Sequence, residues 1–225
     1  MQKYFLVVDT ETSGLPRNWS APYAKENNWP YIVQIAWVIY DANHKEVKRE
    51  NHYLSHTGFT IDKAAQKIHN ISPEYLRAHG ENKEEIMLRF YTDIKKYKPL
   101  VVGHFIELDY HMVNVELFRM GKDDVFKDLS FFCTMKASAM YITGSVISHL
   151  KLDKFYTLLF NEVPENMHNA MSDALSAAKI FFHLIESKKI SLSSVYHQQH
   201  SFNQEKKKVK AFSFKKFLKG IFNGR

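Results

Sequence analysis

The chain has 225 residues but only one cysteine, Cys133. A lone cysteine excludes a disulfide framework and a cysteine-rich zinc site. The sequence also lacks an apolar run near the ~18 residues of a membrane span, so we expect no transmembrane segment. The apolar run over residues 4–8 is shorter than the core of a secretion signal, which takes ~7–15 residues. We therefore predict a soluble, cytoplasmic protein, long enough for one domain with a sizeable core.

The net charge of +7 belongs to the end of the chain. From residue 204 onward there are eight basic residues and one acidic residue, whereas the first 203 residues hold 23 of each. A neutral domain over residues 1–190 and a basic tail over residues 191–225 are therefore predicted. Positive charge over the whole surface, which is typical of proteins that bind nucleic acid broadly, is excluded for the domain.

The tail carries an apolar stripe at helical spacing, i, i+3, i+4 and i+7, formed by Phe214, Phe217, Leu218 and Ile221. Lysines occupy the other faces of this helix, which makes it basic and amphipathic. Such a helix suits a protein partner, an acidic membrane surface or nucleic acid, and a disordered solubilising tail is the alternative. We favour docking of the 204–225 segment onto a replication or repair protein among the functional readings.

Strands and helices alternate in a pattern typical of one α/β domain. β-Branched and aromatic residues predict strands over residues 3–10, 32–40, 47–55, 100–103 and 129–134. Helical spacing and capping residues predict helices over residues 73–79, 81–97, 104–121, 136–141, 152–161 and 170–188. The short connections between the first three strands indicate an antiparallel meander, and the later strands join the sheet by β–α–β crossovers.

Two carboxylates, Asp9 and Glu11, stand where the first strand ends. Residues two apart on a strand point to the same face, so both carboxylates are expected to emerge together. The carboxyl ends of strands in open α/β sheets are where ligands bind. A spacing this short is common by chance, and the pair is weak evidence on its own.

Three further residues lie where a helix meets a loop. Asp109 falls in the first turn of the helix after residues 100–103, and Asp173 falls near the start of the last helix. His168 precedes Asp173 by five residues, a separation that would point the two side chains apart on one helix. We therefore expect His168 in the preceding loop, with Asn169 as the helix cap.

Together these residues predict a metal site. Four carboxylates without matching lysines repel one another unless cations bind among them. Oxygen ligands suit Mg²⁺ or Mn²⁺ rather than zinc. Two such ions are the usual arrangement for in-line attack on a phosphodiester, and a nearby histidine suits the role of general base.

Three segments carry a resemblance to a known family: Val7-Val8-Asp9-Thr10-Glu11-Thr12-Ser13-Gly14-Leu15, Gly103-His104-Phe105-Ile106-Glu107-Leu108-Asp109, and His168-Asn169-Ala170-Met171-Ser172-Asp173-Ala174. They resemble, in order and spacing, the motifs of the DEDDh 3′–5′ exonucleases, which include the proofreading (epsilon) subunit of bacterial DNA polymerase III. The resemblance spans residues 3–188. It implies a ribonuclease H-like α/β fold, with a mixed five-stranded sheet and helices on both faces.

The resemblance also implies roles for individual residues. Asp9, Glu11, Asp109 and Asp173 would bind two Mg²⁺ or Mn²⁺ ions, and His168 would activate the nucleophilic water. The residues expected to contact the 3′-terminal nucleotide are Thr10, Thr12, Leu15, His69, His104 and Phe105. For His104, the more common alternative is a structural histidine whose ring is bound within the protein.

The sequence departs from the family pattern at two of these segments. Phe105 stands where the family usually has Asn, and Asn70, next to His69, stands where the family more often has Gly. Phe105 either stacks on a base or packs inside the protein, and we favour packing. The same alternatives apply to the aromatic residues of the loop over residues 16–30.

The resemblance implies hydrolysis of nucleotides from the 3′ end of nucleic acid, releasing nucleoside 5′-monophosphates. We expect single-stranded DNA as the substrate, in proofreading or repair. Two other hypotheses stay open. One is trimming of RNA ends by the same chemistry, and the other is a catalytically slow module that binds a partner through the tail.

Overall fold

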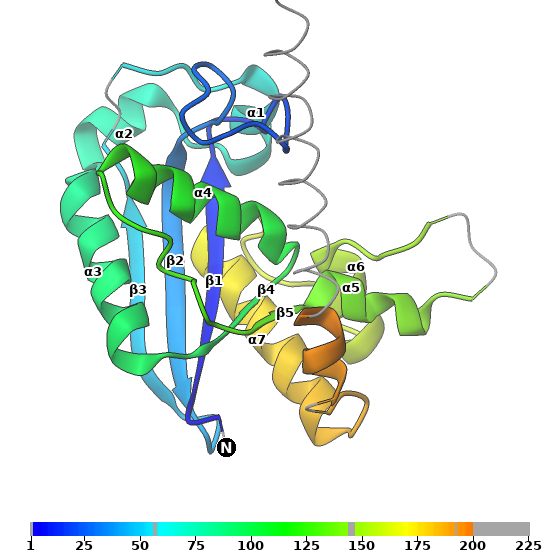
Figure 1. The fold of residues 1–225 in the computed structure, drawn as a ribbon. Helices are drawn as coiled ribbons and strands as arrows, with labels where there is room; N and C mark the ends of the chain where they lie inside the picture. The colour runs from blue at the N-terminus through cyan, green and yellow to red at the C-terminus, as the bar shows by residue number, and fades with distance from the viewer. Residues whose placement is uncertain (1, 56–57, 144–146, 192, 200–225) are drawn as a thin grey trace, which may run out of the picture.

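The computed structural model describes residues 2–55, 58–143, 147–191 and 193–199. Its strands form one five-stranded sheet in the order β3-β2-β1-β4-β5 (Figure 1). The strands are β1 (Tyr4–Thr12), β2 (Ile32–Asp41), β3 (Glu46–Tyr53), β4 (Leu100–Gly103) and β5 (Phe131–Cys133). The first three pair antiparallel, and β4 and β5 continue the sheet parallel to β1. The predicted mixed five-stranded sheet is thus confirmed.

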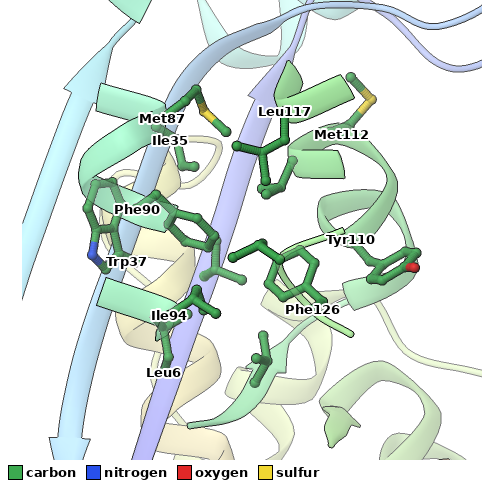
Figure 2. Packing of buried hydrophobic residues seen from close by; sticks show 14 of the residues in the cluster. Leu6, Ile35, Trp37, Met87, Phe90, Ile94, Tyr110, Met112, Leu117 and Phe126 are labelled. Atoms are coloured by element: carbon green, nitrogen blue, oxygen red, sulfur yellow. The ribbon is translucent and has the colours of Figure 1, made fainter. Parts of the chain in front are cut away.

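Helices cover both faces of the sheet, as predicted. On one face, α3 (Lys83–Tyr97) and α4 (Ile106–Arg119) bury an apolar layer against β1 and β2. Figure 2 shows Phe90 of α3 beside Phe126 in this layer, and the two rings meet edge to face with centroids 5.9 Å apart. On the other face, α7 (Ala170–Glu186) buries Phe181 against Val7 and Val38. Each large side chain buried in this way stabilises the fold by about 1.5–3 kcal/mol.

The shorter helices lie around the sheet. They are α1 (Lys63–His69), α2 (Pro73–His79), α5 (Thr134–Ala137), a 3₁₀ turn (Ser138–Tyr141) and α6 (Leu152–Phe160). The sequence pattern did not predict α1. At the start of α2, the Ser72 hydroxyl accepts a hydrogen bond from the Tyr75 amide, as its capping pattern predicts. Gly80 caps the end of this helix, and only glycine fits there because a Cβ would overlap the Leu76 carbonyl oxygen and the Ser55 backbone.

The outer edge of β5 is covered by side chains of residues 193–199, which follow the last long helix. The Gln198 side chain accepts a hydrogen bond from the Cys133 amide at 2.8 Å and donates one to the Cys133 carbonyl at 3.2 Å. The Gln199 side chain accepts from the Phe131 amide at 2.7 Å, and Val195 is buried in the layer beside α7. Packing against the domain therefore continues to residue 199.

Two further sequence predictions concern the tail helix and membrane-spanning segments. The amphipathic helix predicted in the tail lies outside the described residues. Within the described ranges, no helix combines the length and the apolar character that a bilayer crossing requires.

Candidate active site

Asp9 and Glu11 lie on the face of β1 that packs against α7. Val7, two residues before Asp9, belongs to the apolar layer beside α7, and alternation along the strand puts Asp9 and Glu11 on that same side. The strand continues to Thr12, two residues beyond the predicted end, so Glu11 is held within the ladder opposite Gln34 of β2. Both carboxylates are half-buried at the carboxyl end of the strand.

Asp109 comes to the same end of the sheet from α4. It lies in the first turn of that helix and is only 3% exposed. The Thr10 hydroxyl donates a hydrogen bond to Asp109 Oδ1 at 2.8 Å. The Thr10 hydroxyl thus holds this carboxylate, and the Thr10 side chain is 6% exposed.

His168 and Asp173 converge because His168 lies outside the helix, as predicted. Asn169 caps α7, and its Oδ1 accepts hydrogen bonds from the Met171 and Ser172 amides. His168 has a φ of 62°, a left-handed conformation, and its backbone N–H donates to Asp173 Oδ2 at 3.2 Å. This turn reverses the chain just before the helix and brings the exposed imidazole back over the Asp173 carboxylate.

Glu11, His168 and Asp173 each place one ligand atom within 4.8 Å of the others. They come from β1, from the loop before α7 and from its first turn. The electrostatic influence of Asp173 and Asp109 on both Asp9 and Glu11 connects all four carboxylates in one cluster. The structure therefore brings together the five residues predicted from the three motifs.

The pKa values of these carboxyl groups are raised. Burial, followed by the charges of Asp109, Asp173 and Glu11, holds the pKa of Asp9 well above its usual range. Burial, followed by the charges of Asp173 and Asp109, raises the pKa of Glu11 to about 7. Burial raises the pKa of Asp109 to about 7 against the opposing hydrogen bond from Thr10, and burial raises that of Asp173 to about 6.

This charge arrangement fits a divalent cation. Among the described residues, no lysine or arginine forms an ion pair with any of the four carboxylates. Buried carboxylates without cationic partners repel one another, and a cation among them favours their ionised form. Four carboxylates match the oxygen ligand sets of Mg²⁺ and Mn²⁺, with the His168 imidazole close beside them.

Leu15 and Thr12 lie on the segment that leaves β1. The Leu15 side chain is 65% exposed and lines a pocket of about 350 Å³ together with Trp29, Tyr31 and Phe59. The Thr12 hydroxyl is buried and donates to the Gly14 carbonyl at 2.7 Å. The Thr12 side chain thus closes a turn, whereas the Leu15 side chain stays exposed at the pocket.

His69, at the end of α1, is buried near His168. Its Nδ1 accepts a hydrogen bond from the Ile71 amide, while Nε2 makes no hydrogen bond of normal geometry within the described part of the chain. Burial lowers the pKa of this imidazole, and the charge of His168 acts in the same direction. Asn70, which replaces the family's Gly, has a φ of 58°, and Asn adopts this left-handed cap conformation more readily than most residues.

His104 is bound within the protein, as expected for a structural histidine. Its Nε2 donates to the Leu150 carbonyl at 3.1 Å, and its Nδ1 lies 3.0 Å from the Thr134 hydroxyl, which also donates to the Gly103 carbonyl. Burial lowers the pKa of the ring to about 4, so the imidazole is neutral at neutral pH. Both ring nitrogens are therefore engaged in holding the segment between β5 and α6 against β4.

Phe105 packs against the loop over residues 16–30. It precedes α4 with a φ of 68°, and its ring lies 5.7 Å from that of Trp19. Trp29 stacks on His111 of α4 at 5.2 Å, and the Tyr23 hydroxyl hydrogen-bonds to His111 Nδ1. These contacts favour the packing interpretation for Phe105, and they clamp the loop beside the carboxylates.

The comparisons with known proteins agree with this geometry. The model of the exonuclease family (RNase_T) matches residues 6–181. The fold is similar to that of E. coli exonuclease I in complex with a dT13 oligonucleotide, with a TM-score of 0.66 and 19% identity over 81% of this chain and 41% of that one. An exonuclease I structure that addresses how processivity is achieved matches with a TM-score of 0.64 and 19% identity, over 82% of this chain and 44% of that one.

A third match is the zinc-bound complex of E. coli exonuclease I with single-stranded DNA. Its TM-score is 0.63 at 18% identity, covering 82% of this chain and 43% of that one. The chain thus spans less than half of the exonuclease I chains that it matches. Comparison with curated proteins finds no match. Because the family model covers most of the sequence, including every motif carboxylate, this chain belongs to the exonuclease family, and the resemblance to DEDDh exonucleases is confirmed.

Proposed function

We propose that this chain is a metal-dependent 3′–5′ exonuclease that hydrolyses single-stranded DNA and releases nucleoside 5′-monophosphates. The convergence of Glu11, His168 and Asp173 within 4.8 Å, beside Asp9 and Asp109, carries this proposal. Exonuclease I, which shares the fold, has been captured with single-stranded DNA, and this supports DNA as the substrate class. We propose repair or proofreading as the setting.

Asp9, Glu11, Asp109 and Asp173 would hold two Mg²⁺ or Mn²⁺ ions. When bound, the ions supply the positive charge that favours ionised water and stabilises the negative charge of the reacting phosphate. His168 would accept the proton of the attacking water, for which its exposed ring is well placed. The water oxygen forms the new bond to the terminal phosphorus, and the bond to the O3′ of the preceding nucleotide breaks.

The residues around the carboxylates would position the 3′-terminal nucleotide. The exposed Leu15 side chain offers an apolar surface to the terminal base, and the backbone at Thr12 runs beside it. His69, which is buried near His168 and within reach of the Thr12 backbone, would border the terminal nucleotide. Phe105, half-buried beside Trp19, would border the path of the strand.

The test is a digestion of matched single-stranded DNA and RNA, each labelled at its 5′ end, with Mg²⁺, with Mn²⁺ and with chelator. We expect a metal-dependent ladder that shortens DNA from its 3′ end, with RNA much slower. The Asp9→Ala variant, prepared in parallel, should lose this activity and so exposes any contaminating nuclease. Faster trimming of RNA would contradict the proposed substrate, and no ladder from metal-loaded protein would contradict the enzyme.

A further inference from the structure

A single row of side chains crosses three strands of the sheet at the candidate active site. Glu11 of β1 pairs with Gln34 of β2, and Gln34 pairs with Tyr53 of β3. Directly paired residues project to the same face of a sheet, so all three side chains face α7. One end of this row is therefore a proposed metal ligand.

Gln34 binds the first residue of α7. Its side chain is fully buried, and its Oε1 accepts a hydrogen bond from the Ala170 amide at 3.1 Å. Its Nε2 donates to Asn51 Oδ1 on β3 at 2.9 Å, so both ends of the side-chain amide are bound and its orientation is fixed. The sheet thereby satisfies one of the amides that a helix leaves unpaired at its start.

Tyr53 binds the residue that caps α7. The Asn169 Nδ2 donates to the Tyr53 hydroxyl at 3.2 Å, while the Asn169 Oδ1 accepts from the first turn of the helix. The Tyr53 ring is itself supported by Tyr75, with centroids 4.9 Å apart. The contact with Tyr53 therefore fixes which end of the Asn169 amide faces the helix.

His168 lies directly before these two bound residues, in a left-handed conformation with a φ of 62°. Residues with a Cβ adopt this conformation at a cost and keep it only where surrounding contacts hold it. The contacts from Tyr53 to Asn169 and from Gln34 to Ala170 are adjacent in sequence to that strained residue. They also share the row that ends at Glu11.

We propose that Gln34 and Tyr53 are positioning residues that set the place of His168 relative to Glu11 and Asp173. The proposal rests on the exonuclease function proposed above and adds the residues that align its general base. A displacement of about 1 Å in a reacting group is enough to cost ~100-fold in rate. Loss of either contact should therefore lower kcat more than it changes KM.

The experiment compares Tyr53→Phe and Gln34→Met in the full chain, using a 5′-labelled single-stranded DNA oligonucleotide and Mn²⁺. Tyr53→Phe removes only the hydroxyl and keeps the ring against Tyr75. Tyr40→Phe is the matched control, because Tyr40 lies on the same face of β2 but packs near the other end of α7, against Phe182. Thermal unfolding of all variants reports any loss of stability.

We expect kcat to fall by roughly tenfold in each test variant, with KM changed less than about twofold, and Tyr40→Phe to match the wild type. Hydrogen exchange at the Ala170 amide should accelerate in Gln34→Met, a readout that does not depend on activity. Folded variants with accelerated exchange but unchanged kcat would overturn the proposal. If Gln34→Met does not fold, kcat of Tyr53→Phe decides.

The outcomes also separate this proposal from the function on which it rests. A wild-type protein without metal-dependent hydrolysis would overturn both. An active wild type with Tyr53→Phe and Tyr40→Phe equally active would overturn the positioning role alone.

Discussion

The Thr10 hydroxyl and the Asp109 carboxylate are joined by a hydrogen bond of 2.8 Å between β1 and the first turn of α4. Thr10 points away from Asp9 and Glu11, its neighbours in sequence, because side chains alternate along a strand. One strand thus supplies two proposed metal ligands on one face and orients a third from the other. Partners of this kind fix the geometry of ligands and tune their affinity for metal.

Replacement of Thr10 by valine should weaken metal binding with little change in shape. The hydrogen bond from Thr10 lowers the pKa of Asp109 against the effect of burial, so its loss raises that pKa further. Protons then compete with metal up to a higher pH. We expect Mn²⁺ affinity to fall about 10- to 100-fold near neutral pH, measured by titration calorimetry. Thr10→Ser, which keeps the hydroxyl, is the control, and equal affinity in Thr10→Val would contradict the assignment.

The metal-free protein should lose stability as pH rises from about 4 to 7. Burial raises the pKa of Asp109 and Glu11 to about 7 and that of Asp173 to about 6, above the values of an unfolded chain. The folded state then binds more protons than the unfolded state, so unfolding becomes easier as these groups ionise.

Saturating Mg²⁺ or Mn²⁺ should restore that stability above about pH 7. A ligand at 100 times its Kd adds about 2.7 kcal/mol, which corresponds to about 5–10 °C in Tm for a chain of this size. Scanning calorimetry with metal and with chelator, across pH, measures both effects. The same experiment on Asp109→Asn should show a flatter pH dependence, and an identical slope would argue against the raised pKa.

Phe105 should tolerate glycine better than alanine. Both substitutions remove the contact with Trp19, but alanine keeps the cost of a left-handed φ of 68° and glycine does not. The difference should favour Phe105→Gly by about 1 kcal/mol, the reverse of the order inside a helix. Urea unfolding of the two variants measures it. A more stable alanine variant would mean that the backbone relaxes once the ring is gone.

His168→Ala should remove activity without removing metal. Loss of a general base typically costs about 100- to 10,000-fold in rate. The side chain is exposed, so the fold should be retained. Single-turnover hydrolysis and Mn²⁺ titration measure the two properties separately, and added imidazole is expected to recover part of the rate. Near-normal turnover in this variant would exclude His168 as the base.

The sheet and its carboxylates could be predicted because both depend on local patterns. Alternation along β1 places Asp9 and Glu11 on one face. His168 and Asp173 would point apart if both were in one helix, so His168 was expected in the loop before α7. The left-handed conformation of His168, with a φ of 62°, is held by contacts from β2 and β3. The residues next to His168 in sequence therefore do not predict it.

Roles that depend on long-range contacts could not be predicted. His104 contacts Thr134 and Leu150, which are 30 and 46 residues away in sequence, so the motif around His104 did not show what its ring binds. The short helix α1 has a single buried residue, His69, and therefore lacks an apolar stripe. Gln34 did carry a signal, since a polar residue in an otherwise apolar strand implies a specific partner.

The glutamine contacts along β5 bear on how this protein behaves in concentrated solution. An edge strand with free amides and carbonyls is a template on which another chain can add a strand. The side chains of Gln198 and Gln199 form hydrogen bonds with the backbone of Phe131 and Cys133. These bonds take the place of those that a neighbouring strand would make. A chain shortened before residue 198 would present the bare edge of its sheet to other copies, and aggregation would then compete with the native fold.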